Sequence, residues 1–176
     1  MASPHLILVG LPGAGKSTVG RLLATRLERW FSDFDIEIER SIGLSVSEIF
    51  AQQGEAAFRA AEVLVSQRLA LDPRGPGVLA PGGGWIANVD AVAHLRATSR
   101  IIYLRVSPDA AVGRMGRGVV TRPLFKNETP IVVMQRLLDQ RGALYEGAAD
   151  LIVDTDGAES MDVVARVMAS VAAYGT

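Results

Sequence analysis

The segment that most constrains the fold is Gly10–Ser17, which reads Gly-Leu-Pro-Gly-Ala-Gly-Lys-Ser and matches the phosphate-binding loop pattern G-x-x-x-x-G-K-[ST]. It lies between a short apolar run, Leu6–Val9, and a segment of helical period, Lys16–Arg29. This order matters because glycines let backbone N–H groups turn inward towards a phosphate, and the following helix adds the positive end of its dipole. The chain is therefore expected to bind a nucleotide through its phosphates.

Each part of this loop has an expected role. Lys16 is expected to reach the β- and γ-phosphates and to act in catalysis, and the Ser17 hydroxyl is expected to ligate Mg²⁺. The alternative is a glycine-rich turn that merely precedes Lys-Ser, which the flanking strand and helix patterns disfavour. The loop residues expected to contact the nucleotide are Gly13, Ala14, Gly15, Lys16, Ser17 and Thr18.

Short apolar runs alternate with helical segments along the rest of the chain. Strands are expected at residues 6–9, 30–34, 78–80, 100–106 and 149–154. Five strands separated by helices predict an α/β fold with a five-stranded parallel sheet and helices on both faces, and 176 residues fit a single domain, 1–176. Helix starts are indicated by a capping box at Ser45–Glu48 and by Ser107-Pro108 and Thr129-Pro130. The segment 116–125 has no apolar period and is expected to be a loop.

Composition excludes several classes of function. The chain has no Cys, which excludes disulfides, thiol catalysis and Cys-based zinc sites. Its net charge of −1 does not favour nucleic-acid binding. The apolar stretches are too short to span a membrane, and the N-terminal run is too short for a signal peptide. We expect a cytoplasmic monomer with no nucleic-acid or membrane partner.

Two carboxylates, Asp33 and Asp35, follow the second expected strand. The carboxyl edge of a parallel sheet is where ligands bind, and two residues two apart on an extended chain point to opposite sides. We therefore expect different roles for the two, one near Mg²⁺ and the other facing an acceptor hydroxyl. A solvated acidic loop is the alternative.

At this point the sequence resembles the shikimate kinase family, and the resemblance covers nearly the whole chain. Six of the family's motifs occur in order: the phosphate loop Gly10–Thr18, Asp33-Phe-Asp35, Gly54-Glu-x-x-Phe58-Arg59-x-x-Glu62, Gly82-Gly83-Gly84, Arg122-Pro-Leu124 and Arg141-x-x-x-Tyr145. The resemblance implies a single-domain P-loop kinase. It would transfer the γ-phosphate of ATP to the 3-hydroxyl of shikimate, with Mg²⁺ as cofactor.

The resemblance also implies roles for residues of the acid-substrate site. Arg59 and Arg141 resemble the pair that clamps the shikimate carboxylate. Asp35 resembles the residue that holds the ring hydroxyls and orients or deprotonates the nucleophile. The segment Gly82, Gly83 and Gly84 would bring backbone close to the substrate. Because this segment carries no acid, Asp33 is the candidate for the Mg²⁺ shell, through water.

The loop 116–125 resembles the family's mobile lid. Within it, Arg122 resembles the residue that moves over the transferring phosphate, and it is the third expected catalytic residue. Arg117 is expected to lie over the adenine, with Arg114 as a rival for that position. Trp85 departs from the small apolar residue expected there, and it would either narrow the site or pack outside it.

Several alternatives remain open from the residues alone. Phe50 and Phe58 are equally consistent with site walls and with core packing, whereas His5 and His94 are expected to be structural. Gluconate and adenylate kinases share the phosphate loop but do not explain the other motifs. A kinase-like domain that senses an anionic ligand without catalysis is the runner-up, and a regulatory NTPase acting on proteins is a third reading.

Overall fold

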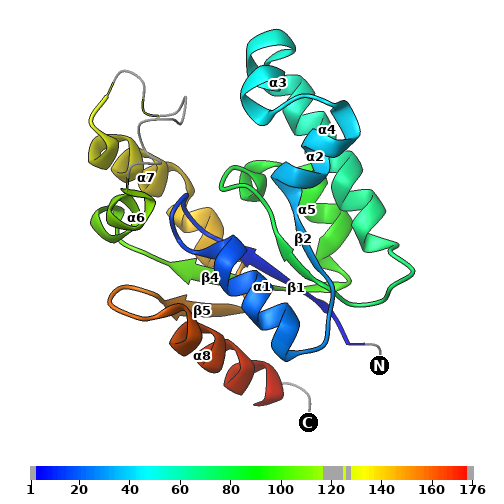
Figure 1. The fold of residues 1–176 in the computed structure, drawn as a ribbon, viewed down its shortest axis with the longest axis vertical. Helices are drawn as coiled ribbons and strands as arrows, with labels where there is room; N and C mark the ends of the chain where they lie inside the picture. Colours follow the sequence, from blue (N-terminus) through cyan, green and yellow to red (C-terminus); the bar gives the residue numbers. More distant parts are fainter. Residues whose placement is uncertain (1–2, 117–124, 126–127, 174–176) are drawn as a thin grey trace.

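The computed structural model describes residues 3–116, 125 and 128–173, in which strands and helices alternate around one sheet (Figure 1). The elements in chain order are β1 (His5–Val9), α1 (Lys16–Arg26), β2 (Phe31–Asp33), α2 (Phe34–Ile42), α3 (Val46–Gln52), α4 (Gly54–Ala70), β3 (Val78–Ala80), the 3₁₀ turn η1 (Trp85–Ala87), α5 (Val89–Arg96), β4 (Ser99–Arg105), α6 (Pro108–Met115), α7 (Pro130–Ala148), β5 (Leu151–Asp154) and α8 (Ser160–Ala173).

The sheet has five parallel strands in the order β2-β3-β1-β4-β5. Its central strand, β1, is buried along its whole length, which explains why it reads as a continuous apolar run. This topology confirms the five-stranded parallel sheet predicted from the sequence.

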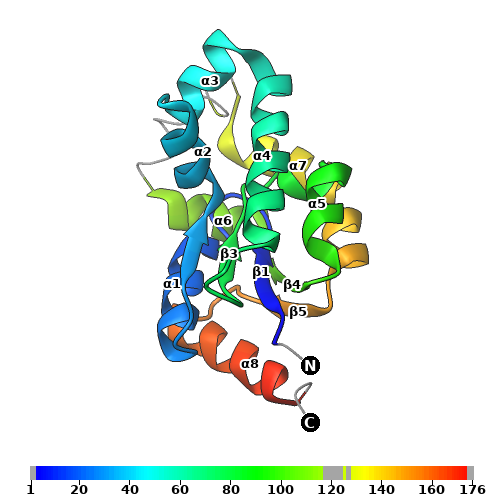
Figure 2. The same ribbon diagram turned by 90° about the vertical axis from the view of Figure 1, so that its right-hand side faces the viewer.

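Helices cover both faces of the sheet, also as predicted. Helices α1 and α8 pack together on one face, while α4, α5 and α7 lie on the other (Figure 2). The apolar core is continuous across the sheet and includes Leu23 of α1, Leu95 of α5, Met134 of α7 and Val167 of α8. Among the residues that the structure describes, no helix is long and apolar enough to cross a membrane.

The local start signals are confirmed at two helices. Ser45 and Glu48 form the reciprocal capping box of α3, and the Ser107 side chain accepts a hydrogen bond from the Ala110 amide at the start of α6. Helix α7 begins at Pro130 as predicted, although the side chain of Thr129 makes no capping bond.

Two boundaries differ from the sequence prediction. The second strand ends at Asp33, where the chain turns at once into α2, so Asp35 lies in the first turn of a helix and not on an extended strand. The turn is stabilised by Asp33, whose Oδ1 accepts a hydrogen bond from the Asp35 amide at 3.1 Å. The segment between β3 and β4, where the apolar pattern predicts one helix near 87–97, is divided into the 3₁₀ turn η1 and α5, with Asn88 as the N-cap residue between them.

The carboxyl ends of β1, β2 and β3 meet at one edge of the sheet, because the strands are parallel and adjacent. Asp33 pairs in register with Ala80, so the end of β2 lies beside the glycine segment that follows β3. Helices α2 and α3 rise above this edge in both views (Figures 1 and 2).

Candidate active site

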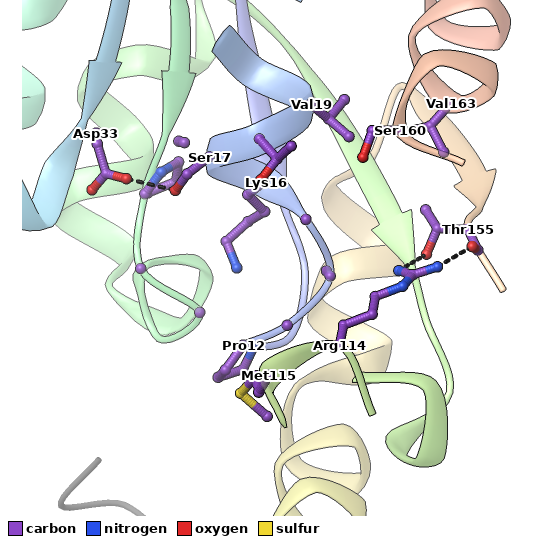
Figure 3. A pocket seen from close by; sticks show the side chains of 18 of the residues that line it. Pro12, Lys16, Ser17, Val19, Asp33, Arg114, Met115, Thr155, Ser160 and Val163 are labelled. Atoms are coloured by element: carbon purple, nitrogen blue, oxygen red, sulfur yellow. Dashed lines mark hydrogen bonds between the residues drawn. The ribbon is translucent and has the colours of Figure 1, made fainter. Parts of the chain in front are cut away.

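A cavity of about 730 Å³ opens at this edge of the sheet. The phosphate loop forms its floor, and the carboxylates of Asp33 and Asp35 lie on its wall beside Gly82 and Gly83. Figure 3 shows Lys16 near the middle, between the pair Ser17–Asp33 and Arg114. The six phosphate-loop residues predicted to contact the nucleotide all line this cavity: Gly13, Ala14, Gly15, Lys16, Ser17 and Thr18.

The loop has the backbone geometry that its glycines allow. Gly13 has a φ of 80°, and a Cβ atom there would lie 2.5 Å from the carbonyl oxygen of Ala111 in α6. Only glycine fits this position. The Lys16 ammonium donates to the carbonyl oxygens of Gly10 at 2.9 Å and Leu11 at 3.0 Å, so its charge lies within the curve of the loop.

Ser17 and Asp33 meet across the cavity, although 16 residues separate them in sequence. The Ser17 hydroxyl donates to Asp33 Oδ2 at 2.6 Å. One hydroxyl and one carboxylate side by side are hard oxygen donors, and Mg²⁺ is commonly bound by one or two such groups together with phosphates and water. The predicted metal residues therefore fit Mg²⁺. No cluster of three or more His, Asp or Glu suited to a metal occurs in the described part of the chain, so the nucleotide and water would have to supply the remaining ligands.

Asp35 lines the same cavity as Asp33, so the two carboxylates do not point to opposite sides as an extended strand would require. The reason is the turn into α2, which bends the chain between them. Burial, with a further contribution from the negative charge of Asp33, raises the pKa of Asp35 from 3.8 to about 6. Asp35 is therefore a carboxylate that is still ionised at pH 7 and takes up a proton readily.

The predicted arginine clamp lies in a second cavity, of about 460 Å³, beyond the glycine segment. Arg59 of α4 and Arg141 of α7 both line it, together with Gly84. A Cβ atom on Gly84 would lie 2.6 Å from Arg59 Nη2, so the glycine makes room for this guanidinium. The structure thus brings the two arginines together, with Gly82 and Gly83 facing the first cavity and Gly84 the second.

Arg59 is held on both sides by carboxylates from its own helix. Glu55 accepts hydrogen bonds from Nε at 3.1 Å and Nη2 at 2.9 Å, and Glu62 accepts one from Nη1 at 2.9 Å. A guanidinium has five N–H donors, so two have no partner among the described residues. These two are enough to bind one further carboxylate in bidentate geometry.

Two supporting residues, Glu62 and Tyr145, belong to the quoted motifs, although the motifs alone indicate no role for them. Glu62 is only 1% exposed and lies on the Arg59 face of α4, as its i+3 spacing could have indicated. Tyr145 donates from its hydroxyl to the Gly83 carbonyl oxygen at 2.5 Å, which fixes the glycine segment. Burial raises the pKa of Tyr145 to about 12, so this phenol remains a hydrogen-bond donor.

Three further arginines, Arg114, Arg117 and Arg122, are candidates for contacts with the nucleotide. Arg114 lines the first cavity and donates to the hydroxyl of Thr155 at 2.9 Å and to its carbonyl oxygen (Figure 3). Arg117 and Arg122 lie outside the described residues, as does the expected lid 116–125 apart from its two end residues. Their predicted roles therefore stay predictions.

Trp85 packs outside the site. It is fully buried, its Nε1 donates to Ser66 Oγ at 3.1 Å, and its ring meets Phe34 edge to face. Phe58 is likewise a core residue, and its ring packs at a tilt against that of the half-exposed Phe50.

Both histidines have structural hydrogen bonds, as expected. His5 Nδ1 accepts from the Gly77 amide at 2.9 Å. The Nε2 atom of His94 lies 3.0 Å from the side-chain nitrogen of Gln67.

Comparison with known proteins places these features in a family. A family model described as shikimate kinase matches residues 12–172. The shikimate kinase of Pseudomonas entomophila is 43% identical over 153 residues, which cover 86% of this chain and 87% of that protein. A solved shikimate kinase from Acinetobacter baumannii in complex with shikimate superposes with a TM-score of 0.90 at 34% identity, covering 98% and 94% of the two chains. A gluconokinase from Sinorhizobium meliloti, at 16% identity with a TM-score of 0.61 and coverage of 97% and 93%, shares the fold alone.

Proposed function

The chain belongs to the shikimate kinase family, and we propose that it transfers the γ-phosphate of ATP to the 3-hydroxyl of shikimate. The products are shikimate 3-phosphate and ADP, in a step of aromatic amino-acid biosynthesis. The observation that carries this proposal is the pair of cavities on either side of the glycine segment: one holds Lys16 and Asp35, and the other holds Arg59 and Arg141.

The phosphate loop supports the nucleotide half of the reaction. Lys16 binds the β- and γ-phosphates and stabilises the charge that develops during transfer. Mg²⁺ would be held by Ser17 directly and by Asp33 through water. When bound there, the ion neutralises negative charge on the phosphates. Arg114 lines the first cavity, where it can contact the nucleotide. Either Arg114 or Arg117 would lie over the adenine.

Asp35 acts on the acceptor hydroxyl. The hydroxyl oxygen forms a bond to the γ-phosphorus while the bond from that phosphorus to the β–γ bridging oxygen breaks, and ADP departs with the electron pair. The hydroxyl proton passes to Asp35, whose pKa of about 6 lies close to neutral pH, where general bases are most effective. We assign Arg122 to charge stabilisation in this step from the sequence motif alone.

The arginine clamp selects the acid substrate. Arg59 and Arg141 bind its carboxylate with charge-assisted hydrogen bonds. The backbone of Gly82, Gly83 and Gly84 lies along the path between this clamp and Asp35, where the ring would sit. The phosphorylated hydroxyl and the carboxylate are thus held at opposite ends of one small molecule.

We further propose that the enzyme acts as a monomer in the cytoplasm. One chain supplies the residues of both cavities, and the cytoplasm supplies the ATP that the reaction consumes. Sedimentation equilibrium at assay concentration tests the first point, since a dimer as the active species would overturn it.

The deciding experiment is an ADP-release assay with shikimate, gluconate and AMP as acceptors. We expect turnover with shikimate and none with the other two. Lys16→Ala serves as the control for contaminating kinases, because removing one positioned cation costs on the order of 10²–10³ in rate. If shikimate binds without ADP release, the chain is a ligand sensor and the kinase proposal fails.

A further inference from the structure

Asn88 connects two parts of the acid-substrate site, the glycine segment and the helix α4 that carries Arg59. It is the single residue between η1 and α5, so it follows the glycine segment closely in sequence. Its Nδ2 group donates to the carbonyl oxygen of Arg59 at 2.9 Å and to Oε2 of Glu62 at 3.1 Å. Both hydrogens of the side-chain amide are therefore donated to acceptors on α4, the helix that carries Arg59.

The contact with Glu62 is important because that carboxylate is buried. Its Oε2 atom accepts from Asn88 and from Arg59 Nη1, while its Oε1 atom has no hydrogen-bond partner among the described residues. A buried carboxylate depends strongly on the few donors it has. Two donors on one oxygen thus fix the plane of the Glu62 carboxylate. Glu62 in turn holds the Nη1 side of the Arg59 guanidinium, while Glu55 holds its Nε side.

We infer that Asn88 is a positioning residue for the substrate carboxylate, acting through Glu62 and Arg59. This inference rests on the proposed function. The Asn88 side chain ties α4 to the end of η1 and keeps Glu62 oriented, so that Arg59 is held in place where it lines the second cavity. Losing the amide should weaken binding of the acid substrate and leave ATP binding unchanged.

Asn88→Ser is the direct test, because Ser caps a helix about as well as Asn but cannot reach both acceptors on α4. We expect the KM for shikimate to rise about tenfold, as for loss of a hydrogen bond to a charged group. The KM for ATP should stay within twofold, and kcat should fall less than threefold. An unchanged KM for shikimate would overturn the inference.

Gln67→Ser is the matched control. The Gln67 side chain also joins α4 to α5, through His94, but it takes no part in the hydrogen bonds of Arg59 and Glu62. We expect normal KM values for both substrates in this variant. If Gln67→Ser raises the KM for shikimate as much as Asn88→Ser does, the effect comes from general helix packing and the positioning role is wrong.

A double-mutant cycle with Arg59→Ala separates positioning from direct contact with substrate, since Asn88 itself lines the second cavity. If Asn88 acts through Arg59, Asn88→Ser should not raise the KM for shikimate further in the Arg59→Ala background. Additive effects would show a direct contact and overturn the inference.

The isosteric Asn88→Asp covers the case in which Asn88→Ser does not fold. Asp also caps helices well, but it places an acceptor where Glu62 needs a donor, so the KM for shikimate should rise at least as much. Circular dichroism and the Tm establish that each variant is folded. Wild-type enzyme without shikimate-dependent ADP release would refute the proposed function, whereas active wild type with an unchanged Asn88→Asp variant would refute only the positioning role.

Discussion

At Asp35, the demands of stability and catalysis conflict. Its pKa is about 6 in the folded chain against 3.8 for an unperturbed Asp, because burial and the charge of Asp33 disfavour the ionised form. The folded state therefore binds the proton more tightly than the unfolded state does. This stabilising contribution is complete below about pH 4 and is lost as the pH rises through about 6.

Asp35→Asn should consequently stabilise the protein at pH 8 while abolishing turnover. The shift of about two pKa units corresponds to a gain of up to about 3 kcal/mol in the free energy of unfolding. The gain should disappear near pH 4, where Asp35 is already neutral in the folded wild type. Urea denaturation of both proteins at the two pH values measures it. If Asp35→Asn lowers the free energy of unfolding by the same amount at both pH values, ionisation of Asp35 does not destabilise the folded wild type.

Asp33 should behave differently, because its partner is Ser17 at the phosphate loop. Asp33→Asn keeps an oxygen for the Ser17 hydroxyl but removes the charge that supports Mg²⁺. We expect the Mg²⁺ concentration for half-maximal rate to rise about tenfold, with activity recovering at high Mg²⁺. Asp35→Asn should not recover at any Mg²⁺ concentration. Identical Mg²⁺ titrations for the two variants would contradict this division of roles.

At the scale of elements, α4 and α7 each present one arginine to the second cavity. Arg59→Ala and Arg141→Ala should each raise the KM for shikimate about tenfold to a hundredfold, because each removes charge-assisted hydrogen bonds to the carboxylate. Lys at either position should rescue only in part, since a single ammonium lacks the planar fork of Arg. Steady-state kinetics with shikimate and ATP varied separately distinguishes weaker binding of shikimate from a general loss of activity.

The same helices supply controls for the clamp. Arg68 of α4 pairs with Glu37, and Arg136 of α7 pairs with Glu128. Neither arginine lines the two cavities of the site. Arg68→Ala and Arg136→Ala should leave both KM values unchanged. A rise in the KM for shikimate in these variants would show that helix charge, and not the clamp, governs binding of the acid.

At the scale of the whole molecule, ligands that bind only the folded state should stabilise it. A hundredfold excess over Kd adds about 2.7 kcal/mol, which corresponds to a rise in Tm of about 5–10 °C for a chain of this length. Shikimate and ATP should each raise the Tm of the wild type. Arg59→Ala should lose the shift with shikimate but keep the shift with ATP, and Lys16→Ala should show the reverse. Loss of both shifts in either variant would mean that the two cavities do not act as separate subsites.

The sequence by itself determined the features that depend on neighbouring residues. The phosphate loop, the capping box at Ser45 and the N-cap at Ser107 were predictable because a few consecutive residues set the backbone angles and the hydrogen bonds there. The parallel sheet followed from the alternation of apolar runs and helical periods. The motifs also named some of the residues that line the two cavities, including Asp35, Arg59 and Arg141.

Only the tertiary structure decided how these residues support one another. Tyr145 bonds to Gly83 across 62 residues of sequence, and Asn88 bonds to Glu62 across 26. No local pattern encodes such pairs, because they exist only once the sheet has set the helices that carry them side by side. The burial of Trp85 and the raised pKa of Asp35 have the same origin. Both depend on which distant groups exclude water from a side chain, and that is a property of the packed molecule.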